Sequence, residues 1–254
     1  MKILMIDVGG SNVKLMATGH EGRRKVPSGP RLTAATMVRE VLKATEDWEF
    51  EAISLGFPGL VSDGRPAREP LNLGGGWLNF DYDKAFKRPV RFINDAAMQA
   101  LANYQKGRML FLGFGTSTGA ALVVDDIIIP LEIGILRLTR RTRFMDALCD
   151  AARQRNGRKR WLNWVYEAVA MMQDVFRPED TVLGGGNAKD INPLPKGCRQ
   201  RDNQVAFTGA ARLWPGADMI AEPYGTSWRI RKKPNSEHPP AAPAKTSPPK
   251  KKKR

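Results

Sequence analysis

The pattern of apolar and polar positions over the first 94 residues predicts a β-hairpin, a long helix and two more strands. Mostly apolar runs predict strands at 2–7, 13–18, 51–57 and 89–93. Apolar residues at helical spacing predict an amphipathic helix over 34–48. The segment 61–77 is rich in Gly, Pro and Asn, which predicts a loop. This part of the chain therefore combines strands and helices in one α/β lobe.

The pattern then begins again in the second half of the chain. Asn94 is a favourable N-cap for a predicted helix over 95–104. Strands are predicted at 108–114, 119–124, 126–131, 180–185 and 204–207. Helices are predicted at 144–154, 161–176 and 209–214. Each half thus starts with a hairpin whose turn is rich in Gly and Ser or Thr.

This repetition predicts two similar α/β lobes that face each other across a cleft. We place the N-terminal lobe at 1–94 and the C-terminal lobe at 95–228. Residues 229–254 are rich in Pro, Ala, Ser and Lys and supply few apolar side chains, which predicts a disordered basic tail.

Composition limits the class of protein. The chain has 254 residues, of which 42% are hydrophobic and 26% charged, as in ordinary soluble globular proteins. The cysteines and histidines are too few and too scattered to predict a structural zinc site or a disulfide framework. The first apolar run is too short for a signal peptide, and no stretch approaches the roughly 18 apolar residues of a membrane span. We therefore expect a cytoplasmic, reducing setting.

The net charge of +15 is unusual, and most of it lies in two segments. The tail 229–254 carries +9 and the segment 137–160 carries +7, so the rest of the chain is slightly acidic. Excess positive charge is typical of proteins that bind polyanions, although a basic run is more often a solvated helix face. Whether the protein binds a polyanion is therefore a question about these two segments and not about the whole surface.

Two glycine-rich hairpin turns are candidates for binding phosphate. The first contains Gly9, Gly10 and Ser11, and the second contains Gly115, Thr116 and Gly119. Glycine lets backbone N–H groups approach phosphate oxygens, and hydroxyl side chains add donors. Each turn alone is equally typical of an ordinary tight hairpin. Neither matches the P-loop or the dinucleotide-binding fingerprint, which disfavours those two classes.

Charged residues adjoin the first turn. Asp7 lies at the end of a predicted buried strand, where burial of a carboxylate costs desolvation free energy unless a nearby cation neutralises it. A hydrated Mg²⁺ beside a phosphate would supply that cation. Lys14 adds a positive charge that could contact the phosphates. The alternatives are a carboxylate that only accepts hydrogen bonds from its own turn and a solvated lysine.

Two further features complete the set. Asp95 follows Asn94 at a junction from strand to helix, where the positive helix end favours an ionised carboxylate that can act as a general base. A plain helix cap is the alternative for this pair. Gly184, Gly185 and Gly186 follow a predicted strand and could let a flat ligand lie on the backbone, or could form an empty loop.

The order of these features resembles the sugar kinase, heat-shock protein and actin superfamily and, within it, the ROK family, especially its polyphosphate glucokinase branch. The fold implied is a two-lobed, actin-like ATPase fold related to ribonuclease H, with a central cleft. The resemblance covers positions 6–211. Its matching segments are IDVGGSNVK, LGFPGLVSDG, LNLGGGW, FINDAA, LGFGTSTGAAL, PLEIG, WLNWV, TVLGGG and NQVAFTGAA.

The resemblance implies a kinase that transfers a phosphoryl group from ATP or polyphosphate, with Mg²⁺, to the 6-hydroxyl of glucose or a related hexose. Asp95 is then the general base, and Asn94, Asn72 and Glu132 contact the sugar. The glycine-rich segments named above, with Ser11 and Thr116, belong to the phosphate and nucleoside sites, and Asp7 belongs to the Mg²⁺ site. Relatives are often dimers, and the zinc motif of many ROK proteins is absent here.

Two departures from the family pattern affect the function. Ile135 stands where the Glu-x-Gly-His sugar motif has histidine, so an expected hydrogen bond to the sugar is missing. Ser117 replaces a glycine of the second phosphate loop. A catalytically weakened protein that binds sugar or nucleotide is therefore an alternative to an active kinase. A third possibility is that the basic tail binds nucleic acid or other polyanions.

Overall fold

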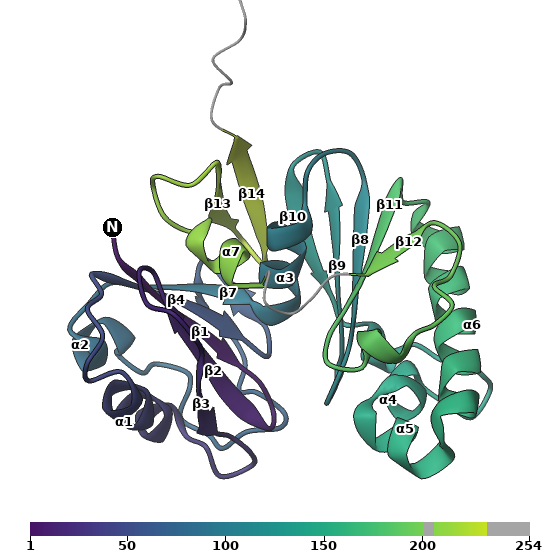
Figure 1. Cartoon of the computed structure of the whole chain (residues 1–254), viewed down its shortest axis with the longest axis horizontal. Coiled ribbons are helices and arrows are strands. Elements are labelled where there is room, and N and C mark those ends of the chain that lie inside the picture. The colour runs from purple at the N-terminus through teal and green to yellow at the C-terminus, as the bar shows by residue number, and fades with distance from the viewer. Residues whose placement is uncertain (201–205, 233–254) are drawn as a thin grey trace, which may run out of the picture.

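The first lobe is built on a five-stranded sheet covered on its outer side by helices (Figure 1). The computed structural model describes residues 1–200 and 206–232. The strand order is β3-β2-β1-β4-β7, with β1 antiparallel to β2 and parallel to β4. The strands are β1 (Ile3–Val8), β2 (Asn12–Ala17), β3 (Arg24–Pro27), β4 (Ala52–Phe57) and β7 (Val90–Asn94).

Helix α1 (Ala34–Ala44) begins where Thr33 accepts a hydrogen bond from the N–H of Thr36, and it ends before the predicted boundary at residue 48. The segment 61–77, predicted as a loop, contains a small hairpin of β5 (Val61–Ser62) and β6 (Arg65–Pro66). A short helix, α2 (Tyr82–Phe86), precedes β7.

The second lobe repeats the same strand order and extends it. Its sheet runs β12-β11-β8-β9-β10-β14-β13, so that β10-β9-β8-β11-β12 corresponds to β3-β2-β1-β4-β7 of the first lobe. The corresponding strands are β8 (Met109–Phe114), β9 (Thr118–Val124), β10 (Ile127–Leu131), β11 (Asp180–Gly184) and β12 (Cys198–Gln200). The sequence analysis thus predicted the duplicated α/β architecture correctly.

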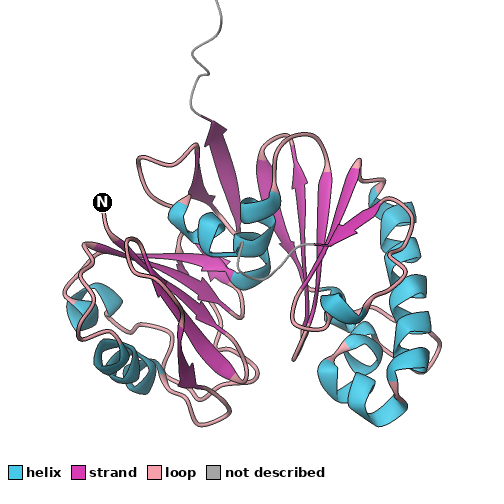
Figure 2. Cartoon of the chain, viewed as in Figure 1, coloured by secondary structure: helices cyan, strands magenta, loops and turns pink. Residues whose placement is uncertain are grey.

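The helices that follow β10 and β11 in the chain lie on the outer face of the second sheet (Figure 2). They are the 3-10 helix η1 (Ile133–Ile135), α4 (Phe144–Leu148), α5 (Asp150–Asn156), α6 (Arg158–Phe176) and the 3-10 helix η2 (Ala188–Asp190). The single helix predicted over 144–154 is divided into α4 and α5, because Cys149 has an extended backbone conformation. Phe144 and Trp161 are fully buried between these helices and the sheet.

Two helices, α3 (Asp95–Asn103) and α7 (Ala206–Ala211), lie between the two sheets (Figure 1). The core of the first lobe continues through them to the inner face of the second sheet at Phe111 and Val123. The segment around α7 is fixed to the first lobe, since Ser54 Oγ donates to the carbonyl of Ala210 at 2.7 Å. The start of α3 therefore rests on a continuous core.

Two predictions for the end of the chain are wrong. Ala206 and Phe207, predicted to end a strand over 204–207, belong to α7, while residues 204 and 205 lie outside the described residues. Residues 229–232, assigned to the tail, belong to β14 (Ser227–Lys232), which pairs with β13 (Met219–Tyr224) and extends the second sheet. The remainder of the predicted tail, 233–254, lies outside the described residues.

Candidate functional site at the junction of the lobes

The first and second glycine loops, here residues 9–12 and 115–117, meet between the lobes. Ser11 Oγ lies 3.4 Å from Thr116 Oγ1. A Cβ placed on Gly10 would lie 3.2 Å from Thr116 Cγ2, so the loops approach closely at this point. Both hydroxyl side chains are exposed. The structure therefore brings together two loops that are 105 residues apart in the sequence.

The third glycine segment, Gly184 to Gly186, lies beside the second loop. A Cβ on Gly115 would be 3.9 Å from the backbone nitrogen of Gly186. Gly185 has a φ of +84° and a Cβ on it would lie 2.2 Å from the carbonyl oxygen of Phe114, so this position requires glycine. Gly184 is buried in β11, whereas Gly186 is exposed with open space around its Cα. Only the end of the segment is thus open to a ligand.

Asp7 and Lys14 form an ion pair beside the first loop. Lys14 Nζ donates to Asp7 Oδ2 at 2.9 Å, and the two residues are opposite each other in the β1–β2 ladder. The Asp7 side chain is 13% exposed. The lysine thus compensates part of the cost of burying this carboxylate.

Asp95 is the first residue of α3, and its carboxylate is the acid most affected by its surroundings at the site. Its Oδ1 accepts a hydrogen bond from the N–H of Ala96 at 2.7 Å. Burial, followed by the negative charges of Asp7 and Glu132, raises the pKa of Asp95 to about 7, and Lys14 opposes this shift. Gly119, on β9, allows the first turn of α3 to approach, since a Cβ there would lie 3.2 Å from Ala96 Cβ.

Asn94 serves as the helix cap. Its Oδ1 accepts from the N–H of Ala97 at 3.0 Å, and its Nδ2 donates to the carbonyl of Gly59 at 3.1 Å. The side chain is buried. Its amide oxygen is therefore engaged in holding α3, and one N–H of the amide is left for a ligand.

The remaining predicted sugar contacts are exposed. Glu132 lies between β10 and η1, and its carboxylate forms no hydrogen bond with the described residues, although its charge acts on Asp95. Ile135, at the end of η1, is 73% exposed. Asn72 is also exposed, in the loop between β6 and α2.

Glu69, which was not predicted from the sequence, organises the loop that carries Asn72. Its carboxylate accepts hydrogen bonds from the backbone N–H groups of Gly76, Trp77 and Leu78 at 3.0–3.2 Å. The Trp77 side chain is fully buried. The only local signal was a carboxylate near several glycines, because its partners are backbone groups that no sequence pattern identifies.

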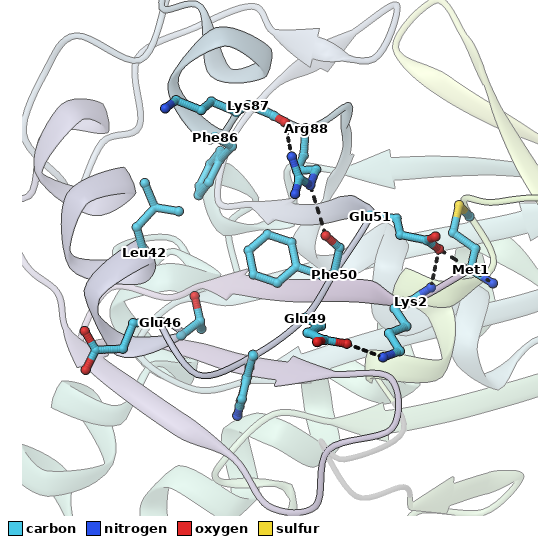
Figure 3. A pocket seen from close by; sticks show the side chains of 12 residues that line it. Met1, Lys2, Leu42, Glu46, Glu49, Phe50, Glu51, Phe86, Lys87 and Arg88 are labelled. Carbon is cyan, nitrogen blue, oxygen red and sulfur yellow. Dashed lines mark hydrogen bonds and ion pairs between the residues drawn. The ribbon is translucent and has the colours of Figure 1, made fainter.

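A hollow of about 730 Å³ lies elsewhere on the first lobe (Figure 3). Its apolar floor includes Leu42, Phe50 and Phe86, and charged side chains at its rim pair with each other, as Lys2 does with Glu49 at 2.6 Å. It adjoins the start of β1, whereas ligands of α/β sheets bind at the carboxyl ends of strands. We therefore place the functional site at the loops between the lobes.

Residues 1–200 and 206–232 contain neither a candidate membrane span nor a cluster of metal-ligating side chains. Among the helices described, none is long and apolar enough to cross a membrane. Within the same residues, no group of three or more His, Cys, Asp or Glu side chains is placed to hold a metal ion.

The arrangement of two duplicated sheets with helices between and outside them matches the fold of solved ROK sugar kinases. The inorganic polyphosphate/ATP-glucomannokinase from Arthrobacter sp. strain KM matches with a TM-score of 0.71 and 24% identity over 83% of this chain and 96% of that one. The ROK glucokinase from Streptomyces griseus, in complex with glucose and AMPPNP, matches with a TM-score of 0.67 and 16% identity over 84% and 99%.

A ROK family transcriptional regulator has a similar fold, with a TM-score of 0.62 and 15% identity over 83% of this chain and 76% of that chain. No protein-family model matches the sequence, and no curated protein matches it. These likenesses define the fold, so the activity has to be argued from the site itself.

Proposed function

We propose that this protein is a sugar kinase that transfers a phosphoryl group from ATP or polyphosphate to the 6-hydroxyl of a glucose-like hexose, with Asp95 as the general base. The observation that carries the proposal is the position of Asp95 at the start of α3, where its carboxylate is close enough to Asp7, near the first glycine loop, and to Glu132, in the predicted sugar segment, for both charges to act on it. A pKa of about 7 suits a base that works near neutral pH.

Asp95 acts on the acceptor hydroxyl. Its Oδ1 is held by the N–H of Ala96, and its Oδ2 has no partner within the described part of the chain. The hydroxyl proton passes to Oδ2 as the sugar oxygen attacks the terminal phosphorus of the donor. The bond from that phosphorus to the bridging oxygen breaks, and ADP or a shortened polyphosphate leaves.

The hexose acceptor is bound by Glu132, Asn72 and Asn94. The free Glu132 carboxylate can accept hydrogen bonds from two sugar hydroxyls, and the remaining N–H of Asn94 can donate one. Asn72 is presented by the loop that Glu69 holds. These groups orient the hexose so that its 6-hydroxyl meets Asp95.

Donor binding falls to the glycine segments. The backbone N–H of Gly10 and the hydroxyls of Ser11 and Thr116 contact the donor phosphates, and the exposed Gly186 adjoins them. Gly9 and Gly115 shape the two turns, because their N–H groups donate to the carbonyls of Asn12 and Ser117, each at 3.1 Å. Gly119 and Gly185 allow the close packing that forms this region. Lys14 adds a cation that can move from Asp7 to a phosphate oxygen.

The residues present fit a Mg²⁺ ion bound with the donor. Asp7 Oδ2 pairs with Lys14, while Oδ1 has no partner among the residues described. Mg²⁺ in phosphoryl-transfer sites is commonly held by one or two carboxylates, often through water, together with substrate phosphates. Asp7 would hold the ion in this way, and the ion would neutralise charge on the donor phosphates.

The test is the substitution Asp95→Asn, assayed by ADP release over a panel of hexoses and repeated with polyphosphate as donor. We expect kcat to fall by about 10²–10⁴-fold, because the proton acceptor is lost, while calorimetry still detects hexose binding. Asp63→Asn, in the exposed β5–β6 turn, is the matched control and retains full activity. Turnover of Asp95→Asn within twofold of the wild type would overturn the assignment.

The exposed Ile135 favours one alternative, a weakened sugar-binding or nucleotide-binding protein. A hydrophobic side chain in place of the expected histidine cannot donate a hydrogen bond to the sugar. Ile135→His should lower the KM for glucose by about tenfold if the site is an active kinase, as one hydrogen bond is regained. A wild-type protein that binds hexose but shows no turnover with either donor supports the alternative.

A further inference from the structure

An arginine hairpin, defined here as residues 137–143, projects between η1 and α4. Leu138 N–H donates to the carbonyl of Thr142 at 2.9 Å, and Phe144 N–H donates to the carbonyl of Leu136 at 2.8 Å. Within the turn, Thr139 Oγ1 accepts hydrogen bonds from the backbone N–H groups of Arg141 and Thr142. The hairpin is thus a defined element held by backbone hydrogen bonds.

The hairpin carries an unfavourable arrangement of charge. Four of its seven residues are arginine, and all four are exposed: Arg137, Arg140, Arg141 and Arg143. Arg137 and Arg143 form an antiparallel bridge, so like charges lie directly opposite each other, which destabilises a hairpin. None of the four guanidinium groups pairs with a carboxylate within the described residues. The exposed guanidiniums therefore present four unneutralised charges to solvent.

The hairpin is connected to both halves of the candidate site. It follows Glu132 and η1 directly in the chain, and η1 packs against α4. At the other end of this segment, the N–H of Asp150 in α5 donates to the carbonyl of Gly115 at 2.7 Å. A short, well-packed segment thus links the arginine hairpin to the second glycine loop.

The side chains of the hairpin match phosphate better than they match bases. Guanidinium groups form paired hydrogen bonds with phosphate oxygens, and threonine hydroxyls add single donors. The hairpin has no aromatic side chain on which a base could stack, and stacking is a main term in binding single-stranded nucleic acid. A polymer made only of phosphate groups fits this surface better than RNA or DNA.

We propose that the arginine hairpin is a docking surface for a linear polyphosphate chain, distinct from the glycine loops that hold the reacting phosphates. This inference rests on the proposed function, since it assigns the far end of a donor chain to residues 137–143. A long chain contacts both places at once, so its affinity exceeds that of a short chain that reaches the glycine loops alone.

The test is direct binding of a long linear polyphosphate and of tripolyphosphate by the full chain, measured at several salt concentrations. The double variant Arg140→Gln/Arg141→Gln removes two charges at the turn and leaves the backbone hydrogen bonds in place. We expect it to bind the long chain at least about tenfold less tightly at low salt. The slope of log affinity against log salt should decrease by about 1.4, while tripolyphosphate binding is unchanged.

The control is Arg39→Gln/Lys43→Gln, which removes two exposed charges from α1 in the first lobe. Equal losses in both variants would mean that only net charge matters, and the proposal fails. It also fails if the hairpin variant binds the long chain as the wild type does. Tighter binding of an RNA oligonucleotide with the same number of phosphates, lost in the hairpin variant, would make the surface a nucleic-acid site.

The binding result is separate from the kinase assignment. If hexoses are phosphorylated from ATP but the hairpin variant binds polyphosphate normally, the docking proposal fails and the kinase stands. If no hexose is phosphorylated but long-chain binding depends on Arg140 and Arg141, the kinase assignment fails while the hairpin remains a polyphosphate-binding surface.

Discussion

The two lobes differ most at the position where their first strands approach the site. Asp7 is the fifth residue of β1, and it lies opposite Lys14 on β2 and beside Gly56 on β4. At the same place in the second lobe, the fifth residue of β8 is Gly113, which lies opposite Gly119 and beside Gly184. An ion pair in one lobe thus corresponds to two glycines in the other.

This difference indicates a division of work between two copies of one topology. The first lobe places an ion pair beside its glycine loop, whereas the second lobe places an uncharged backbone surface at the corresponding position. The excess positive charge of the second lobe lies in the connection from β10 to β11. That connection spans residues 132–179 and is twice as long as the corresponding connection, 28–51, in the first lobe. The added length contains the arginine hairpin.

The largest expected effect is a loss of stability on substitution of Gly185, whose backbone packs against Phe114 in the second lobe. In Gly185→Ala, the new Cβ would lie 2.2 Å from the carbonyl of Phe114, at a φ of +84°. We expect the free energy of unfolding to fall by more than about 4 kcal/mol, which thermal or urea denaturation would measure. Gly186→Ala is the matched control, because nothing lies within 4 Å of its Cβ position, and it should fold normally. Equal stability of the two variants would contradict the packing described.

A smaller effect is the pH dependence of stability that arises from Asp95, at the junction of the two lobes. The pKa of Asp95 is about 7 in the folded protein, above the value near 3.9 expected for an unfolded chain. The folded state therefore retains a proton that the unfolded state has lost between about pH 4 and pH 7, so stability falls as the pH rises through this window. Asp95→Asn lacks this ionisation, and its stability should depend less on pH.

The full pKa shift of Asp95 would change the free energy of unfolding by at most about 4 kcal/mol, and the partial exposure of its side chain reduces this contribution. We expect Asp95→Asn to be more stable than the wild type by about 1–3 kcal/mol at pH 8, and the difference to vanish near pH 4. Denaturation at both pH values measures it. A variant that is less stable than the wild type at pH 8 would exclude a raised pKa at this position.

Features of the two lobes that are encoded by a few adjacent residues could be predicted from the sequence. The positions of the two glycine-rich turns, of Asp7 near the end of β1 and of Asn94 as the cap of α3 each depend on a few adjacent residues, and the structure confirms these positions. The strand pair β13 and β14 was missed because its sequences, MIAEPY and SWRIRK, mix charges and a proline with apolar residues, as edge strands do. The basic residues at 229–232 were assigned to the tail for the same reason.

Contacts between distant segments could not be predicted in this way. The four-residue run 204–207 was predicted as a strand, because short apolar runs do not distinguish a strand from a buried helix. Phe207 is buried in the core that links the lobes, and this packing determines the helix. The raised pKa of Asp95 likewise depends on burial, and then on the charges of Asp7 and Glu132, all of which arise only in the folded chain.

The smallest expected effect concerns the contact between the two glycine loops themselves. Ser11 Oγ and Thr116 Oγ1 lie 3.4 Å apart, and both side chains are exposed, so the hydrogen bond adds little stability. In a double-mutant cycle of Ser11→Ala and Thr116→Ala, we expect a coupling energy of about 0.5 kcal/mol without ligand. In the proposed function both hydroxyls contact phosphate oxygens of bound ATP, and in that case the coupling measured from ATP affinities should increase. Additive effects on ATP binding would mean that the two lobes contact the donor independently.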